Sequence, residues 1–319
     1  MKMKSKKALT AWLAVALAAL TGCELNESGK SSREMRVVTF NILFSGDSIG
    51  TSKGWEHRKG DLMALLRRLN PDIAGFQEVC PDQQEWMKEQ MPDYGFSGEY
   101  RGTEIVGGIP MSGSPVVWRK SRFAAGKCGT FWLSPTPDVP GSFGWGSRSP
   151  RVCCWQILTD RQTGKTFCFA NMHADHKSPL SKLNGNKVLV ARLSEIAGGM
   201  PVVLIGDHNT HEAEPPAQTL AKAWHNAIYR SETPPKGPWR SYNGWKVLEN
   251  EISTEDAIKE SAEVRMKERS RFGGGRPDYI YVSDGIRVLS YETVSEMRPG
   301  LDLYYSDHFP VFADILMDR

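Results

Sequence analysis

A ten-residue stretch, PVVLIGDHNT at 201–210, constrains the fold of this 319-residue chain more than any other feature. Its four apolar residues are mostly β-branched and stand between a proline and a glycine, which is typical of a short buried strand. Asp207 and Asn209 follow the glycine at once. A carboxylate and an amide at the exit of a buried strand either meet a ligand or close an Asx turn. The stretch alone leaves both interpretations open.

The same pattern recurs along the chain, with polar residues at the ends of other predicted strands. These strands span residues 36–40, 73–76, 166–170, 202–205, 279–282 and 309–316. The polar residues that follow a strand are Asn41, Glu78, His173 and Asp207, and those that precede one are Asp278, Asp307 and His308. If all of them meet at one edge, the last two strands run opposite to the first four. We therefore expect an α/β fold in which two mixed sheets pack face to face with helices outside.

Helical periodicity marks four segments, which span residues 55–70, 81–91, 181–197 and 254–269. In the first segment leucines recur on one face, and Asn70-Pro71 ends the helix. The last segment has acidic residues first and basic residues later, as an exposed helix prefers. Two segments lack such a pattern: residues 134–149 are predicted to be a loop, and residues 212–250 to be irregular.

The N-terminus is predicted to lie outside the fold. Four lysines precede an apolar stretch, residues 8–20, that is too short to span a bilayer comfortably, as in a signal segment. Residues 20–23, LTGC, resemble the bacterial lipoprotein cleavage box, which implies lipid attachment at Cys23. An ordinary cleaved signal peptide is the alternative. Residues 24–34 then form a polar tether, and residues 35–319 form the folded domain, anchored at the cell envelope outside the cytoplasm.

Removal of residues 1–23 changes the charge of the chain. The full sequence has 40 basic and 37 acidic residues, and the segment carries four lysines and no acid. The mature chain then has 36 basic and 37 acidic residues, a net charge of −1. Proteins that hold many phosphates of a polymer usually carry a basic excess. The charge therefore does not favour nucleic acid as the partner.

Five cysteines remain after Cys23, and none belongs to a C-x-x-C pair. They are Cys80, Cys128, Cys153, Cys154 and Cys168. We expect small buried thiols rather than disulfides, and the odd number leaves at least one thiol unpaired in an exported protein.

We expect the protein to be a monomer.

The polar residues at the strand ends suggest a cation. They comprise four carboxylates, two amides and two histidines: Glu78, Asp207, Asp278, Asp307, Asn41, Asn209, His173 and His308. Several acids that converge without basic partners usually hold a metal ion. Oxygen donors without thiolates suit Mg²⁺ or Mn²⁺ better than structural zinc.

Six motifs together resemble the endonuclease/exonuclease/phosphatase superfamily, which has the fold of DNase I. They are TFNI (39–42), GFQEV (75–79), NMHADH (171–176), GDHN (206–209), PDYIYVS (277–283) and SDHFPV (306–311), in the family's order. Residues 129–152 look closest to a bacterial branch of exported hydrolases. The resemblance implies a four-layer α/β/β/α sandwich of two mixed sheets and metal-dependent hydrolysis of a phosphate ester.

The resemblance also implies a role for each matching residue. Glu78 is the main metal carboxylate, with Asn41 and Asp307 nearby. Asp207 orients or deprotonates the attacking water, and Asn209 contacts the phosphate. The remaining roles concern the two histidines: His308 pairs with Asp278 and stabilises charge on the phosphoryl group, while His173 is a second donor across it. Arg151 is either a phosphate clamp or a surface charge beside a loop.

Two positions depart from the family pattern. His208 stands where the family usually has Phe, and it is either a packing ring or an extra phosphate or metal contact. Ser112 stands where the branch often has Glu, so substrate preference can differ. Five aromatic residues in loop-like segments either cap the core or touch a sugar, base or membrane: Trp132, Phe143, Trp145, Trp239 and Trp245.

Other functions were weighed against this one. Residues 173–176 partly match the H-x-H-x-D-H ligands of metallo-β-lactamase-type zinc hydrolases, but Asn171 stands at the first ligand position. A surface-tethered binding protein that kept the fold without the chemistry is a non-enzyme alternative. Among active enzymes, we expect a small phosphate ester or a lipid headgroup as substrate, and a nuclease or sphingomyelinase-like phosphodiesterase is the alternative.

Overall fold

The computed structural model describes residues 34–317 except 103–104, 107–108, 111, 248, 250 and 269–274. Residues 1–33, which include the predicted signal segment, Cys23 and nearly all of the tether, lie outside the described residues. No helix within the described ranges combines the length and apolarity needed to cross a membrane.

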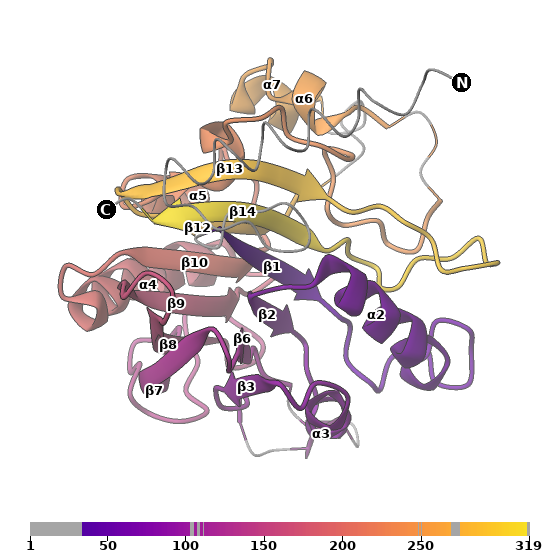
Figure 1. Cartoon of the computed structure of the whole chain (residues 1–319), viewed down its shortest axis with the longest axis horizontal. Helices are drawn as coiled ribbons and strands as arrows, with labels where there is room; N and C mark the ends of the chain where they lie inside the picture. Colours follow the sequence, from indigo (N-terminus) through magenta and orange to yellow (C-terminus); the bar gives the residue numbers. More distant parts are fainter. Residues whose placement is uncertain are drawn as a thin grey trace, which may run out of the picture.

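Two six-stranded mixed sheets form the body of the protein (Figure 1). The first sheet has the order β13-β14-β1-β2-β6-β3, with β1 Met35–Asn41, β2 Ile73–Gln77, β3 Tyr94–Ser97, β6 Val116–Arg119, β13 Ile286–Thr293 and β14 Val311–Met317. The second has the order β11-β12-β10-β9-β8-β7, with β7 Phe123–Trp132, β8 Val152–Asp160, β9 Thr166–His173, β10 Val202–Asp207, β11 His225–Asn226 and β12 Asp278–Val282. A separate pair joins β4 Ile105–Val106 to β5 Ile109–Pro110.

Helices cover the outer faces of both sheets. The helices are α2 Trp55–Leu69, α3 Pro81–Gln90, α4 Pro179–Ala197, α5 Pro215–Ala221, α6 Thr254–Ala257 and α7 Ala262–Lys267, with a 3-10 turn η1 at Ala227–Arg230. Leucines of α2 pack on Val38 and Phe40 of the first sheet, and leucines of α4 pack on Leu204 of the second. The predicted four-layer α/β/β/α sandwich is therefore confirmed.

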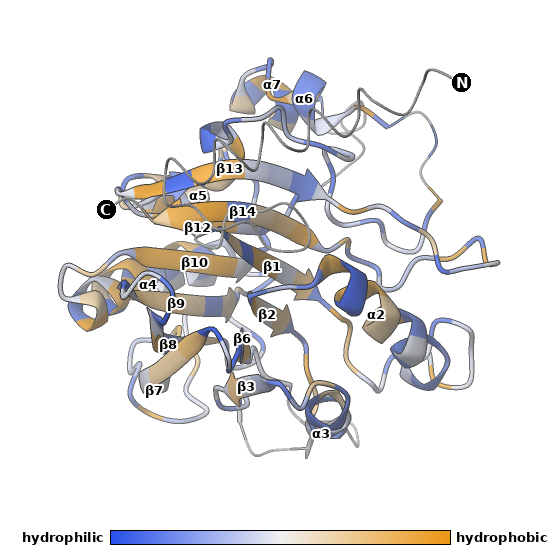
Figure 2. Ribbon diagram, viewed as in Figure 1, coloured by the Kyte–Doolittle hydropathy of each residue, from blue (hydrophilic) through white to orange (hydrophobic). Residues whose placement is uncertain are grey.

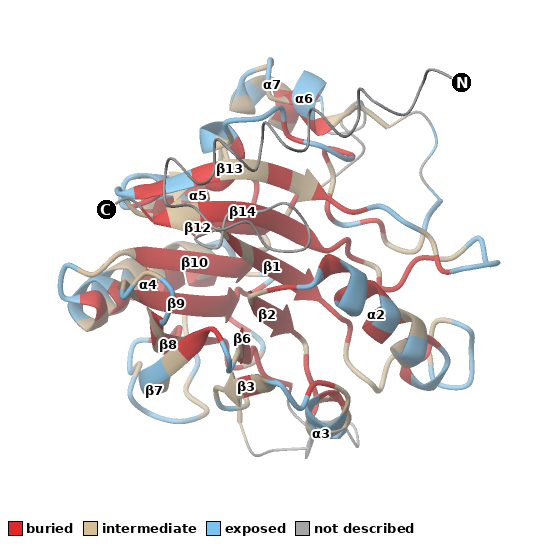
Figure 3. Ribbon diagram, in the orientation of Figure 1, coloured by how far each residue is buried: buried red, intermediate tan, exposed pale blue. Residues whose placement is uncertain are grey.

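The main core lies between the two sheets, because alternate residues of each strand face opposite sides. Val37 of β1 and Ile205 of β10 face this inner layer, whereas their neighbours Val38 and Leu204 face the helices. The central strands, such as β1, β2 and β10, are accordingly apolar and buried along most of their length (Figures 2 and 3). Asp207 lies two residues beyond Ile205, so its side chain continues the inner face to the edge of the sheet.

The strand directions bring the predicted polar residues to one edge. β1 runs parallel to β2, and β9 parallel to β10, whereas β14 is antiparallel to β1 and β12 is antiparallel to β10. Asp207 is consequently the register partner of both His173 and Asp278. The prediction that the last two of these strands run opposite to the others is confirmed.

Two sequence predictions about the connecting segments are wrong, and one strand was missed. The exposed helix expected over 254–269 is two short helices, since Ser261 caps α7 and the buried Arg265 donates to the Ala257 carbonyl oxygen (2.8 Å) between them. The segment 212–250, expected to be irregular, contains α5, β11 and η1. β13 was not predicted, because it mixes exposed and buried residues at the sheet edge.

The structure describes all five cysteines that follow Cys23. None of the five forms a disulfide with another described cysteine, and all except Cys128 are buried. Among the five aromatic residues in the predicted loops, Trp132 and Trp239 are buried in the core, whereas Phe143 is exposed.

Candidate active site

A cavity of about 690 Å³ opens at the strand edge described above. Seven of the predicted site residues line it: Glu78, Arg151, His173, Asp207, Asn209, Asp307 and His308. Asn41 and Asp278 lie behind this lining and bond to members of it. The structure therefore brings together every predicted site residue that it describes.

Asn41 holds two of the carboxylates together. Its Nδ2 donates to Oε1 of Glu78 (3.2 Å) and to Oδ2 of Asp207 (3.0 Å). Its Oδ1 accepts the backbone N–H of Leu43 (3.1 Å), so the amide nitrogen is the end that faces the carboxylates. The fully buried amide thus fixes the spacing between an acid of the first sheet and an acid of the second.

Backbone strain accompanies two of the site residues. Glu78 follows β2 with φ of 64°, and Asn209 follows β10 with φ of 48°. Asparagine tolerates this left-handed region, but for glutamate it costs roughly 1–3 kcal/mol. The conformation turns the Glu78 carboxylate toward the backbone N–H of Phe44, which donates to Oε2 (3.3 Å). Strain that aims a carboxylate into a cavity is typical of functional sites.

Gly206 allows β10 to approach β9 closely enough to place Asp207. Its φ is 147°, and a Cβ at this position would stand 2.0 Å from the carbonyl oxygen of Met172. A side chain at 206 would therefore push apart the two strands that carry Asp207 and His173.

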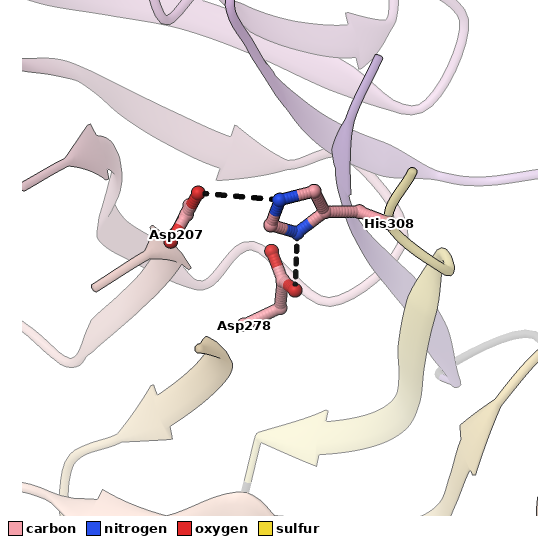
Figure 4. Close-up of side chains that lie close together, drawn as sticks. All are labelled: Asp207, Asp278 and His308. Carbon is pink, nitrogen blue, oxygen red and sulfur yellow. Dashed lines mark hydrogen bonds and ion pairs between the residues drawn. The ribbon is translucent and has the colours of Figure 1, made fainter. Parts of the chain in front are cut away.

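His308 lies between two carboxylates, as Figure 4 shows. Its Nδ1 is 2.9 Å from Oδ2 of Asp278 and its Nε2 is 3.8 Å from Oδ2 of Asp207. Burial alone lowers the pKa of His308, but the carboxylates of Asp278 and Asp207 outweigh burial and raise this pKa well above the ordinary imidazole value. His308 is therefore a cation at neutral pH, with an N–H on both nitrogens.

The same three residues have the geometry of a small metal-binding group. Ligand atoms of Asp207, Asp278 and His308 all lie within 4.8 Å of one another. An imidazole protonated on both nitrogens has no lone pair for a metal, however. Glu78 and Asp307 line the same cavity and offer carboxylate oxygens to a cation without using the nitrogens of His308.

His173 faces Asp207 from the opposite side and has a different partner. Its Nε2 is 3.5 Å from Oδ2 of Asp207, and Nη2 of Arg101 lies 3.4 Å from its Nδ1. A guanidinium can only donate, so Nδ1 accepts and Nε2 carries the proton. Burial and the charges of Arg151 and Arg101 lower the pKa of His173 well below the usual value. His173 is therefore a neutral donor.

Arg101 is the site residue that sequence reasoning missed. It lines the cavity and bonds to Ser112 Oγ (2.6 Å) as well as to His173. It lies in a glycine-rich run of short strands and turns, where no periodic pattern or motif marks one charged residue. No local signal in the sequence could have identified it.

Arg151 is buried, with 5% of its surface exposed, so the alternative of a surface charge is wrong. Its Nη2 lies 3.1 Å from Nδ1 of His176, and its Nε lies 3.8 Å from Oδ2 of Asp175. The guanidinium lines the same cavity as Arg101. A phosphate-binding role remains compatible with this position.

A family model described as the Endonuclease/Exonuclease/phosphatase family matches residues 38–308. The chain belongs to this family. Two similar solved structures come from Bacteroides thetaiotaomicron. One is another protein of the family, 24% identical with a TM-score of 0.75, covering 90% of this chain and 98% of that one. The other is a mannosyl-6-phosphatase, also 24% identical, with a TM-score of 0.74 and covering 89% and 100%. At this identity the likeness shows the fold alone.

Nocturnin of Drosophila melanogaster is 25% identical over 175 residues, which cover 52% of this chain and 26% of nocturnin. The matched region therefore spans about a quarter of that relative. The predicted family is confirmed. The branch of exported hydrolases, inferred from residues 129–152, and the lipid anchor, inferred from residues 20–23, stay predictions.

The structure describes both residues that depart from the family pattern, His208 and Ser112. His208 is completely buried and packs edge-on against Tyr279 and Tyr281, with ring centroids 5.5 and 5.4 Å away. Of the two alternatives, His208 is therefore a packing ring and not an extra phosphate or metal contact. Ser112 is buried beside the cavity, where its hydroxyl accepts from Arg101.

The zinc-hydrolase interpretation is wrong. Asn171 does not face a metal site but joins the two sheets: its Nδ2 donates to the carbonyl oxygens of Phe76 (2.9 Å) and Pro115 (2.8 Å). Its Oδ1 accepts from Gln77 Nε2 (2.6 Å).

Proposed function

We propose that this protein hydrolyses a phosphate ester with a divalent hard cation, Mg²⁺ or Mn²⁺. The observation that carries the proposal is one cavity in which carboxylates of both sheets face a charged histidine, a neutral histidine and an asparagine. Each group is of the type that phosphoryl transfer to water requires.

The donor set fits such a cation. Burial raises the pKa of Asp207 to about 6, and burial together with Glu78 also raises the pKa of Asp307. These shifts indicate carboxylates without enough positive charge around them, which a bound cation would supply. Glu78 and Asp307 would hold it, with Asn41 setting the spacing, and the all-oxygen chemistry suits Mg²⁺ or Mn²⁺. The bound cation neutralises charge on the phosphoryl oxygens.

The side chains of this protein would supply the remaining steps. Asp207 takes a proton from the attacking water as oxygen bonds to phosphorus, and the bond to the leaving oxygen breaks. Its Oδ1 is held by the backbone N–H of Asn209 (3.0 Å), which leaves Oδ2 facing the cavity. His308 and His173 each present an Nε2–H beyond hydrogen-bonding distance of Asp207, so both are available to phosphoryl oxygens.

Asp278 and Asn209 would position this machinery. Asp278 orients the imidazole of His308 and maintains its charge through the 2.9 Å contact. Asn209 donates to the carbonyl oxygen of Ala174 (3.2 Å) and lines the cavity, where its amide can contact the phosphate.

The proposed substrate is a small phosphate ester or a lipid headgroup met outside the cytoplasm, by a monomer anchored through a lipid on Cys23. The polar lining of the cavity supports a hydroxylated leaving group, and it includes Lys182, Thr210 and Glu214. A sugar phosphate has this chemistry, and one similar structure is a mannosyl-6-phosphatase.

A substrate panel with Mg²⁺ and EDTA arms tests the proposal. The substrates are p-nitrophenyl phosphate, bis-p-nitrophenyl phosphate, mannose 6-phosphate, sphingomyelin and plasmid DNA. We expect hydrolysis that EDTA abolishes and that Glu78→Gln lowers by at least about 100-fold, with Glu232→Gln, on the surface, as the matched control. Folded wild-type protein that hydrolyses none of them would favour the binding-protein alternative instead.

A further inference from the structure

Two arginines line one wall of the cavity, and neither donates a hydrogen bond to a carboxylate among the described residues. Arg101 bonds only to neutral groups, Ser112 Oγ and His173 Nδ1, and its buried Nε has no hydrogen-bond partner among the described residues. Within ion-pair distance Arg151 has one described carboxylate, Asp175, at 3.8 Å from its Nε, and the charges of Glu78 and Asp207 also favour both guanidiniums without forming an ion pair with them among the described residues. A guanidinium in such surroundings is costly unless an anion completes its contacts.

Both carboxylate oxygens of Asp175 already accept hydrogen bonds from its own loop and from Ser147. Its Oδ1 accepts the backbone N–H groups of Lys177 (2.8 Å) and Ser178 (2.6 Å), and its Oδ2 accepts from Ser147 Oγ (2.9 Å). These bonds orient the carboxylate toward its own loop. Asp175 therefore makes only a long contact with Arg151, and no ion pair joins it to Arg101 among the described residues.

The two guanidiniums also repel each other. Burial and the charge of Arg151 lower the pKa of Arg101 to about 9, and burial lowers the pKa of Arg151 as well. Like charges held together at the edge of a low-dielectric core favour an anion between them. The other groups on this wall are polar, namely Ser112, Ser149 and His176.

The charge of the ligand decides which phosphate ester fits this wall. A phosphate monoester at neutral pH carries nearly two negative charges and three terminal oxygens, whereas a diester carries one charge and two such oxygens. Two planar guanidiniums match the monoester better, because each guanidinium can donate hydrogen bonds to two oxygens. The second organic group of a diester would instead have to lie against charged donors.

We propose that Arg101 and Arg151 bind the terminal oxygens of a phosphate monoester and so select monoesters over diesters. The inference rests on the proposed phosphoester hydrolysis and names its substrate class. Arg101 is a specificity residue in this account: its contribution depends on the charge of the substrate.

The test compares kcat/KM for p-nitrophenyl phosphate and bis-p-nitrophenyl phosphate, with Mg²⁺, in wild type, Arg101→Gln, Arg101→Lys and Arg151→Gln. We expect the wild type to prefer the monoester. Each glutamine variant should lower the monoester value by about 100-fold and the diester value by less than about fivefold. The ratio of the two values does not depend on how much of the enzyme is folded. Arg287→Gln, which breaks a surface pair on β13, is the matched control and should leave the ratio unchanged.

A second measurement covers the case in which a glutamine variant does not fold. Arg101→Lys keeps the charge but loses the planar fork, so the inhibition constant of inorganic phosphate should rise about tenfold. A wild type that prefers the diester, a parallel loss on both esters, or an unchanged inhibition constant would overturn the inference while hydrolysis itself stands. Absence of any Mg²⁺-dependent hydrolysis would instead overturn the proposed function.

Discussion

His308 and His173 face the same carboxylate oxygen of Asp207 from two sides, yet they carry different charges. Both present Nε2 to it, at 3.8 and 3.5 Å. The difference lies at Nδ1, where His308 meets the carboxylate of Asp278 and His173 meets the guanidinium of Arg101. The carboxylate of Asp278 raises the pKa of His308, whereas burial, with the charges of Arg151 and Arg101 added to it, lowers the pKa of His173. The comparison teaches that a carboxylate behind a buried ring can outweigh burial and keep the ring charged, whereas a guanidinium adds to the effect of burial and keeps the ring neutral.

His308→Ala should produce the largest effect, because it removes a charged donor from the transition state. We expect kcat to fall by about 1,000-fold with little change in melting temperature. Steady-state kinetics with p-nitrophenyl phosphate and thermal unfolding check this. Turnover within fivefold of wild type in a stable variant would exclude His308 from the chemistry.

Asp278→Asn should have a smaller effect, since it leaves the ring in place but removes the group that keeps it charged. We expect a loss of about 10- to 100-fold in kcat. Because the Asp278 carboxylate raises the pKa of His308, its loss should move the alkaline limb of the pH–rate profile to lower pH. A profile that keeps its alkaline limb would mean that another group holds the charge.

His173→Ala should cost about fivefold in kcat, because a neutral hydrogen bond contributes about 1 kcal/mol. The shape of the pH–rate profile should stay as in wild type, since His173 is neutral throughout the working range. A new or displaced limb would show that His173 titrates during turnover and that Arg101 does not keep it neutral.

His208 is a third buried histidine, and neither of its ring nitrogens has a hydrogen-bond partner among the described residues. Burial lowers its pKa to about 3. The unfolded chain, with an ordinary value near 6.5, therefore binds a proton more readily, and stability is lost as pH falls below about 6.5. His208→Phe should remove this loss, about 2 kcal/mol at pH 5, and leave kcat within twofold. Urea unfolding of wild type and His208→Phe at pH 7.5 and pH 5 measures this loss of stability. An equal loss in the two proteins would contradict the prediction.

The sequence predicted the elements whose signals are local. Strands such as β1, β2 and β10 are short apolar runs that end in a polar residue, so both the strand and the exposed group at its exit can be read directly. Their convergence follows from strand direction. The family resemblance added the pairing of Asp278 with His308, which their separation in the chain conceals.

The missed features depend on tertiary contacts. β13 lies at a sheet edge, where a mixed pattern of exposed and buried residues gives little periodicity. Arg265 separates α6 from α7 through a bond that no helical pattern contains. Arg101 acquires its role from His173, 72 residues away, and from Ser112, so only the folded chain shows it.

The position of a bound metal ion tests the central claim most directly. Crystals grown with Mn²⁺ and measured by anomalous diffraction would locate the ion. The account predicts a peak coordinated by Glu78 and Asp307, with His308 still bonded to Asp278. A peak within the Asp207–Asp278–His308 group, or no peak at saturating Mn²⁺, would contradict it.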